Sequence, residues 1–229
     1  MSFEDKCLKV GILGASGYTG VELVRILSQH PNVEIVFLTA DRHRDKSVRD
    51  LFPHLGSVRL PIMTHIDEAE WKSIDTDFIF CGLPHGTTQE VISDLLDGVE
   101  NSQDFSNSVN QGIPDTQGLP LGSRLIDLSA DFRIQDVTLW EQWYNTKHAC
   151  PELIPHAVYG LPEVNREQIK TAELIAVPGC YPTAIQLGFL PLLESDLVDS
   201  RRLIADAKSG VSGAGRSAAI ETQFSERSD

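Results

Sequence analysis

Basic residues are scarce in this chain of 229 residues. It holds 19 lysines and arginines against 33 aspartates and glutamates, which gives a formal net charge of −14 at pH 7. Because like charges repel, such a surface is not attracted to phosphate-rich polymers or anionic headgroups. We therefore expect no general binding to nucleic acid or to an anionic membrane, although one basic pocket for a small anion is compatible with this charge.

Long apolar runs are also missing, since no stretch approaches the ~18 residues that would cross a bilayer. The first six residues are polar and acidic, unlike a secretory signal or a transit peptide. The four cysteines form no CxxC pair and no spacing typical of metal ligands. We therefore expect no membrane span, no metal site, and reduced thiols in a cytoplasmic protein.

The length suffices for two modest domains, since domains typically run to ~100–200 residues. The pattern favours a division into residues 1–178 and 179–229. Residues 97–123 are rich in Asn, Ser, Gln, Gly and Pro with little periodicity, which predicts a loop insertion in the first domain.

A glycine-rich turn joins a predicted strand, Leu8–Leu13, to a predicted helix, Val21–Gln29. Glycines at 11, 14, 17 and 20 would let the backbone approach a pyrophosphate, whose charge the N–H groups at the helix start would hold. The GxxGxxG spacing is longer than the usual dinucleotide fingerprint, so the strand–turn–helix placement carries the prediction. The alternative is a turn that only packs the helix on the strand.

The end of the second predicted strand, Val33–Thr39, bears on the choice of cofactor. An acidic residue here would bind the ribose 2′-hydroxyl of NAD, whereas an arginine would accommodate the 2′-phosphate of NADP. Asp41 stands beside Arg42, Arg44 and Lys46. We favour NADP with Arg42 on the 2′-phosphate, and the alternative is a solvated charged loop.

A further buried strand begins at Phe78 and ends in a glycine–proline loop, before a helix predicted from Thr88 to Leu96. Ligands of open α/β sheets lie beyond the carboxyl ends of the strands, so Gly82, Pro84 and His85 are expected to border the cofactor. Cys81, inside the apolar run, is expected in the core.

The stretch Pro178–Thr183 follows an apolar run, Leu174–Val177, and precedes a helical pattern, Ala184–Leu193. Cys180 is thereby expected near a helix N-terminus, where orphan N–H groups and the positive end of the dipole favour a thiolate. We interpret the stretch as a nucleophile loop. The alternative is that Cys180 is a small buried apolar residue.

Leu203–Lys208 has the pattern of a strand and runs into Ser209–Arg216, a segment of small hydroxyl and glycine residues that ends in arginine. Glycines expose backbone N–H groups, and Arg216 offers a planar bidentate fork, so the segment is typical of a phosphoryl site. A flexible linker is the alternative.

Together these stretches resemble the N-acetyl-gamma-glutamyl-phosphate reductase family of arginine biosynthesis. The motifs that carry the resemblance, in order, are Gly14–Gly20, Phe80–Gly86, Ile126–Arg133, Tyr159–Glu163, Pro178–Thr183 and Lys208–Arg216. The resemblance implies an α/β fold, with a Rossmann-type NADP-binding domain followed by a mixed α/β catalytic domain of the semialdehyde dehydrogenase type. It also implies a homo-oligomer.

The chemistry implied by the resemblance is the NADPH-dependent reduction of N-acetyl-L-glutamyl 5-phosphate to the semialdehyde, with Cys180 forming a thioester. Ser209, Gly210 and Arg216 would bind the substrate or its phosphate. The implied cofactor-binding residues are Gly14, Ser16, Gly17, Tyr18, Thr19, Gly20, Thr39, Arg42, Gly82, Pro84, Ser129, Ser212 and Gly213. A related aspartyl- or aminoadipyl-phosphate reductase, and a non-catalytic NADP-binding module, are the alternatives.

Two features depart from the family pattern. The 97–123 segment is longer than the family usually has, and the seven histidines all precede Cys180. Family members continue well beyond this length and supply an acid/base histidine from a His-x-His motif after the Ser-Gly-rich loop. We therefore expect a chain truncated at its C-terminus, whose second domain lacks part of its sheet and exposes apolar surface.

Overall fold

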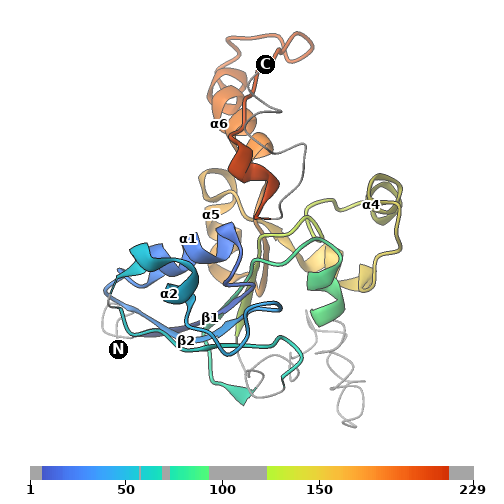
Figure 1. Cartoon of the computed structure of the whole chain (residues 1–229). Coiled ribbons are helices and arrows are strands. Elements are labelled where there is room, and N and C mark those ends of the chain that lie inside the picture. Colours follow the sequence, from blue (N-terminus) through green and yellow to red (C-terminus); the bar gives the residue numbers. More distant parts are fainter. Residues whose placement is uncertain (1–6, 57, 69–72, 93–122, 217–229) are drawn as a thin grey trace. The chain divides into compact units, whose positions relative to one another are not determined.

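The computed structural model describes residues 7–56, 58–68, 73–92 and 123–216. The chain divides into two compact units, Met1–Val177 and Pro178–Asp229. Figure 1 labels two strands of the first unit and, in orange, the helix α6 (Cys180–Glu194) of the second. The predicted insertion at 97–123 lies outside the described residues except for Ser123.

The first unit is built on one parallel sheet of seven strands. The strand order is β3-β2-β1-β4-β5-β7-β6. The chain leaves β1 toward one edge and returns to β4 on the other side of β1, so the strand order reverses between β1 and β4, where open α/β sheets bind ligands. The strands are β1 (Leu8–Leu13), β2 (Val33–Thr39), β3 (Met63–Thr64), β4 (Phe78–Cys81), β5 (Arg124–Asp127), β6 (Val158–Tyr159) and β7 (Leu174–Ala176).

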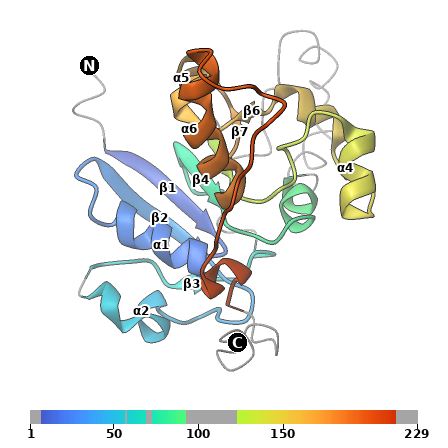
Figure 2. The same cartoon turned by 90° about the horizontal axis from the view of Figure 1, so that it is seen from above.

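Helices and short 3-10 turns connect the strands and cover both faces of the sheet. Figures 1 and 2 show α1 and α2 along the same side of β1 and β2. The helices are α1 (Tyr18–Leu27), α2 (Val48–Leu51), α4 (Val137–Tyr144), α5 (Pro162–Thr171) and, in the second unit, α6 (Cys180–Glu194), while residues 87–92 are also helical. The 3-10 turns are η2 (Pro53–Leu55), η5 (Pro151–His156) and η6 (Val211–Ala214).

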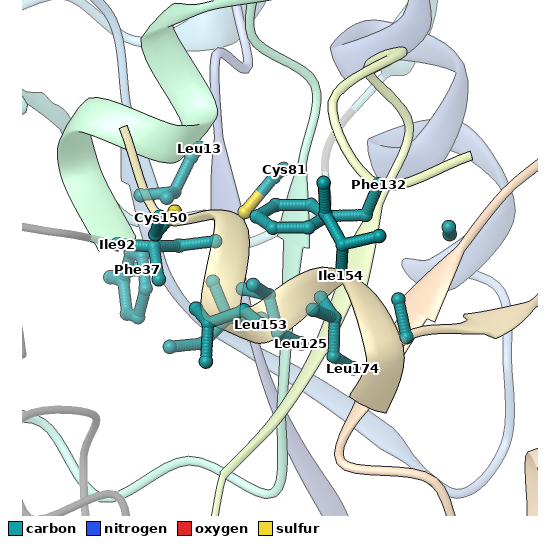
Figure 3. Close-up of a cluster of buried hydrophobic side chains, with 13 residues drawn as sticks. Leu13, Phe37, Cys81, Ile92, Leu125, Phe132, Cys150, Leu153, Ile154 and Leu174 are labelled. Carbon is teal, nitrogen blue, oxygen red and sulfur yellow. The ribbon is translucent and has the colours of Figure 1, made fainter. Parts of the chain in front are cut away.

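Two apolar clusters form the core of the first unit. One joins Val21 and Val24 of α1 to Val10 and Ile12 of β1. The other packs η5 on β4, β5 and β7, and Figure 3 shows its labelled side chains. Trp140 of α4 is fully buried, but the neighbouring Trp143 is 75% exposed, so only part of the aromatic mass on α4 is core.

The α/β fold predicted from the sequence is confirmed, with three differences. The helices α1 and α6 begin at Tyr18 and Cys180, a few residues earlier than their apolar patterns indicate. The prediction that Gly11 serves a ligand is wrong, because it lies inside β1 and a Cβ there would stand 2.0 Å from the Phe37 ring. Glycine at 11 instead makes room for that ring.

The predicted strand at Leu203–Lys208 is not formed, since none of its residues has strand structure. A strand needs a neighbour for its backbone N–H and C=O groups, and the described part of the second unit supplies none. Apolar side chains consequently stay in solvent: Ile204 is 90% exposed, and none of the 15 residues of α6 is buried.

Candidate active site

The loop between β1 and α1 has the geometry of an anion cradle. Gly14 has φ of +80°, which favours glycine, and a Cβ at Gly20 would stand 2.3 Å from the carbonyl oxygen of Gly14. Gly17 caps α1 without a side-chain hydrogen bond, and the first turn of α1 holds no acidic residue. The N-terminal N–H groups and the positive end of the helix dipole are thus available to a negatively charged ligand.

Gly17 tests whether a dinucleotide fits this cradle. A Cβ built at Gly17 would meet only the carbonyl oxygen of Gly14, at the ordinary distance of 3.5 Å. Packing within the protein therefore leaves room for a side chain at Gly17. A pyrophosphate bound close to the protein backbone at this position would not leave that room. The open helix start and the spare space at Gly17 fit a pyrophosphate group.

Neighbouring strand ends hold the cradle in place. The side-chain oxygen of Thr39 accepts a hydrogen bond from the Gly14 N–H at 3.2 Å, and its carbonyl accepts one from the Ala15 N–H at 2.8 Å. A Cβ at Gly14 would stand 2.6 Å from the carbonyl oxygen of Gly82, so the loops after β1 and β4 touch through their backbones. Thr39 is fully buried, so its two hydrogen bonds with the loop are made inside the protein.

The other residues of the first unit that were predicted to bind or border the cofactor lie in the segments that follow β1, β2 and β4. Ser16 is half-buried, Tyr18 is 44% exposed, and Thr19, Arg42 and Pro84 are exposed. His85 is exposed, and its ring centroid lies 5.3 Å from that of Tyr144.

Ser129 belongs to a buried network at the end of β5. Its hydroxyl donates to Asp127 Oδ2 at 2.8 Å and accepts from the Asp131 N–H at 3.1 Å. Burial raises the pKa of Asp127 to about 6, although the hydrogen bonds from Ser129 and the charge of Arg133 oppose this shift. The single donor of Ser129 is therefore used inside the protein, and its contribution to the site is to shape this loop.

Asp131 and Arg133 are further functional candidates, and no role for either was predicted from the sequence. The Asp131 carboxylate accepts hydrogen bonds from the N–H groups of Gly86 and Gln89, so it caps the helix at 87–92. The Arg133 guanidinium donates to the carbonyl oxygens of Leu128 at 2.8 Å and Val177 at 2.6 Å. The loop after β5 thus holds the segments that follow β4 and β7. In the sequence, only the acid and the arginine of Ser-Ala-Asp-Phe-Arg indicate such a role.

Asp41 and Arg42 follow β2, at the place expected for the adenosine ribose. Arg42 is exposed. The carboxylate oxygen Oδ1 of Asp41 lies 3.0 Å from Nε2 of His65, a residue that directly follows β3. No local pattern indicates this partner, because the two residues are 24 positions apart in the sequence.

In the second unit, Cys180 is the exposed first residue of α6. Gly179 caps this helix without a side-chain hydrogen bond, and its carbonyl accepts from the Thr183 N–H at 3.0 Å. Since Pro182 has no N–H, the N–H donors of the first turn of α6 are those of Cys180 and Tyr181. These two N–H groups can stabilise an oxyanion formed next to the sulfur.

A groove of about 380 Å³ runs beside Cys180 within the second unit. One wall is α6, from Tyr181 to Phe189, and the other is formed by residues 205–209. Ser209 therefore lies on the same groove as the sulfur. Lys208, also on the groove, pairs with Asp206 at 2.6 Å.

The rest of the predicted phosphoryl segment forms a tight turn. A Cβ at Gly213 would stand 2.6 Å from Ser209 Oγ, and Gly210 precedes η6 as its cap. Ser212 and Arg216 are exposed. Ser212 and Gly213 belong to the second unit rather than to the unit that carries the cradle.

All four cysteines are free, and their surroundings differ. Burial raises the pKa of the Cys81 thiol well above its ordinary value and that of Cys150 to about 12. Both thiols stay protonated near neutral pH, so Cys81 is confirmed as a core residue. Cys7 and Cys180 are the two exposed sulfurs.

Within the part of the chain that the structure describes, no group of three or more His, Cys, Asp or Glu side chains is placed to hold a metal ion. None of the helices in these ranges is both long and apolar enough to cross a membrane.

Comparison with known proteins gives two family matches. Residues 9–172 match the model of the semialdehyde dehydrogenase NAD binding domain, and residues 180–229 match the semialdehyde dehydrogenase dimerisation domain. The two matches divide the chain at nearly the same place as its compact units.

Curated relatives are similar over almost the whole chain. N-acetyl-gamma-glutamyl-phosphate reductase of Nitrosospira multiformis is 50% identical over 97% of this chain and 58% of that protein. The protein of the same name from Saccharophagus degradans is 48% identical over 97% of this chain and 57% of its own length. Rhodospirillum rubrum has another, 49% identical over 92% and 54%. The chain therefore spans less than three fifths of the length of these relatives.

Proposed function

The chain belongs to the semialdehyde dehydrogenase family, and we propose that it carries the NADP site and the nucleophile of an N-acetyl-gamma-glutamyl-phosphate reductase. The observation that carries the proposal is the position of Cys180, an exposed sulfur at an uncapped helix start on the edge of a groove. The names of the relatives support the choice of substrate.

In the proposed reaction, the Cys180 thiolate attacks the gamma-carbonyl carbon of N-acetyl-L-glutamyl 5-phosphate. A C–S bond forms, the C–O bond to phosphate breaks, and inorganic phosphate leaves with the electron pair. The N–H groups of Cys180 and Tyr181 stabilise the oxyanion formed in this step, a contribution that is worth about 2.7–4 kcal/mol per donor in another enzyme. Ser209, Gly210 and Arg216 bind the departing phosphate.

When bound, NADPH would supply the hydride that reduces the thioester carbon. The C–S bond then breaks, N-acetyl-L-glutamate 5-semialdehyde leaves, and the Cys180 thiolate is restored. Gly14, Gly17 and the first turn of α1 hold the pyrophosphate, and Arg42 holds the 2′-phosphate that distinguishes NADP from NAD.

The acylation step is the direct test, because it needs neither hydride nor a further catalytic residue. The chain is incubated with N-acetyl-L-glutamyl 5-phosphate without NADPH and examined by mass spectrometry. We expect one N-acetylglutamyl adduct on Cys180 with release of phosphate, no adduct in Cys180→Ser, and an unchanged adduct in Cys7→Ser, which removes the other exposed sulfur.

Other outcomes separate the alternatives. Faster acylation by aspartyl phosphate or an aminoadipyl phosphate would replace the proposed substrate. NADPH binding without acylation by any of the three, together with alkylation of Cys180 no faster than of Cys7, would favour a module that only binds the cofactor.

The match of residues 180–229 to a dimerisation domain supports a homo-oligomer. The exposed apolar residues of α6, among them Leu187 and Leu192, are consistent with such an interface. The four free thiols support a reducing compartment such as the cytoplasm.

A further inference from the structure

The loop after β2 is held against β3 in a fixed conformation. The Asp45 N–H donates to the carbonyl oxygen of Met63 at 2.7 Å, and the Met63 N–H donates to that of Lys46 at 3.1 Å. Asp45 has φ of +63°, a left-handed conformation that fixes the turn. The charged side chains of residues 41–46 are therefore presented by an ordered turn at the carboxyl edge of the sheet.

His65 contacts one of these charged side chains, Asp41. Its side chain is only 22% exposed, whereas that of Asp41 is 78% exposed. The Asp67 N–H donates to Nδ1 of His65 at 3.2 Å. Because a carboxylate oxygen can only accept, Nε2 is the donor in the contact with Asp41 Oδ1 at 3.0 Å. The Asp67 carboxylate lies 3.3 Å from the same Nδ1. A half-buried ring thus contacts and orients an exposed carboxylate.

The position of that carboxylate gives the contact a chemical meaning. A carboxylate that follows the second strand of a dinucleotide-binding fold accepts a hydrogen bond from the ribose 2′-hydroxyl of NAD, and its charge repels a 2′-phosphate. Here the carboxylate is next to Arg42, which is suited to a 2′-phosphate. We propose that His65 determines the preference for NADP by holding the Asp41 carboxylate away from the phosphate that Arg42 binds. This inference rests on the NADP site of the proposed function.

The test measures dissociation constants of NADPH and NADH by fluorescence titration of this chain, so it needs no catalytic turnover. In His65→Ala the Asp41 carboxylate is released. One unit charge about 4 Å from another in water changes an affinity about fivefold, and a 2′-phosphate carries up to two. We expect the ratio of NADPH to NADH affinity to fall about five- to thirtyfold.

Two further variants isolate the role of Asp41. In His65→Ala combined with Asp41→Asn, the ratio should return to the wild-type value or exceed it, because the repelling charge is gone. His30→Ala is the matched control. Nδ1 of His30 accepts a hydrogen bond from the Asn32 N–H at 3.2 Å, the same local contact that His65 makes with Asp67. His30, however, precedes β2 and so lies at the amino ends of the strands. This control should leave the ratio unchanged.

Three results would overturn the inference. An unchanged ratio in His65→Ala, with wild type preferring NADPH, removes the role of His65 and leaves the proposed function intact. A loss that Asp41→Asn does not restore means that His65 contacts the phosphate itself. A wild-type chain that binds NADH as tightly as NADPH, or binds neither, refutes the NADP assignment and this inference with it.

Discussion

Replacing Asp127 by asparagine should make the chain more stable relative to wild type as the pH rises. Burial raises the pKa of Asp127 from 3.8 to about 6 in the folded protein. The folded state therefore binds a proton more tightly than the unfolded state, and the stability linked to this group is lost as the pH rises through 6. A shift of about two pKa units corresponds to about 3 kcal/mol over the whole titration, of which about half falls between pH 5 and pH 8.

Urea unfolding of both proteins at pH 5, 6, 7 and 8 measures this difference, because the other titratable groups cancel in the comparison. The signal is the fluorescence change as the fully buried Trp140 becomes exposed. Ser129→Ala is a second check: it removes the hydroxyl hydrogen bond that lowers the pKa of Asp127 and keeps the one from the backbone N–H, so the pH dependence should move to higher pH. A difference that is flat with pH, or that shifts in favour of wild type as the pH rises, would refute the assigned environment of Asp127.

Three further substitutions test the cradle and the loop that braces it. Gly20→Ala should destabilise the chain by more than 1 kcal/mol, because its Cβ meets backbone 2.3 Å away, and thermal unfolding measures the loss. Gly17→Ala should keep most of the stability, since its Cβ meets nothing closer than 3.5 Å, yet should weaken NADPH binding; retained binding would argue against the cradle. Arg133→Met should cost about 2 kcal/mol and speed hydrogen exchange of the Val177 amide, and unchanged exchange there would show that Arg133 does not brace the end of β7.

The sequence predicted those parts of the site that depend on local chemistry. The glycine turn after Leu13 and the cysteine after Gly179 could be recognised because backbone freedom and helix N-termini involve only neighbouring residues. The predicted strand Leu203–Lys208 failed for the opposite reason: its residues suit a strand, but a strand forms only where a partner accepts its hydrogen bonds.

Pairs that are distant in the sequence were decided by the tertiary structure alone. No local pattern reveals that Gly14 lies against the carbonyl group of Gly82, or that Asp131 caps the helix that begins next to Gly86. The contact between His65 and Asp41 is equally invisible in the sequence. Such contacts depend on strand order, because the sequence of neighbours β3-β2-β1-β4-β5 brings each of these pairs of strand ends side by side. The sequence by itself thus determined which chemical groups the chain offers and on which local elements they stand. Their partners were set by the sheet, since each hydrogen bond requires two groups that folding alone brings within reach.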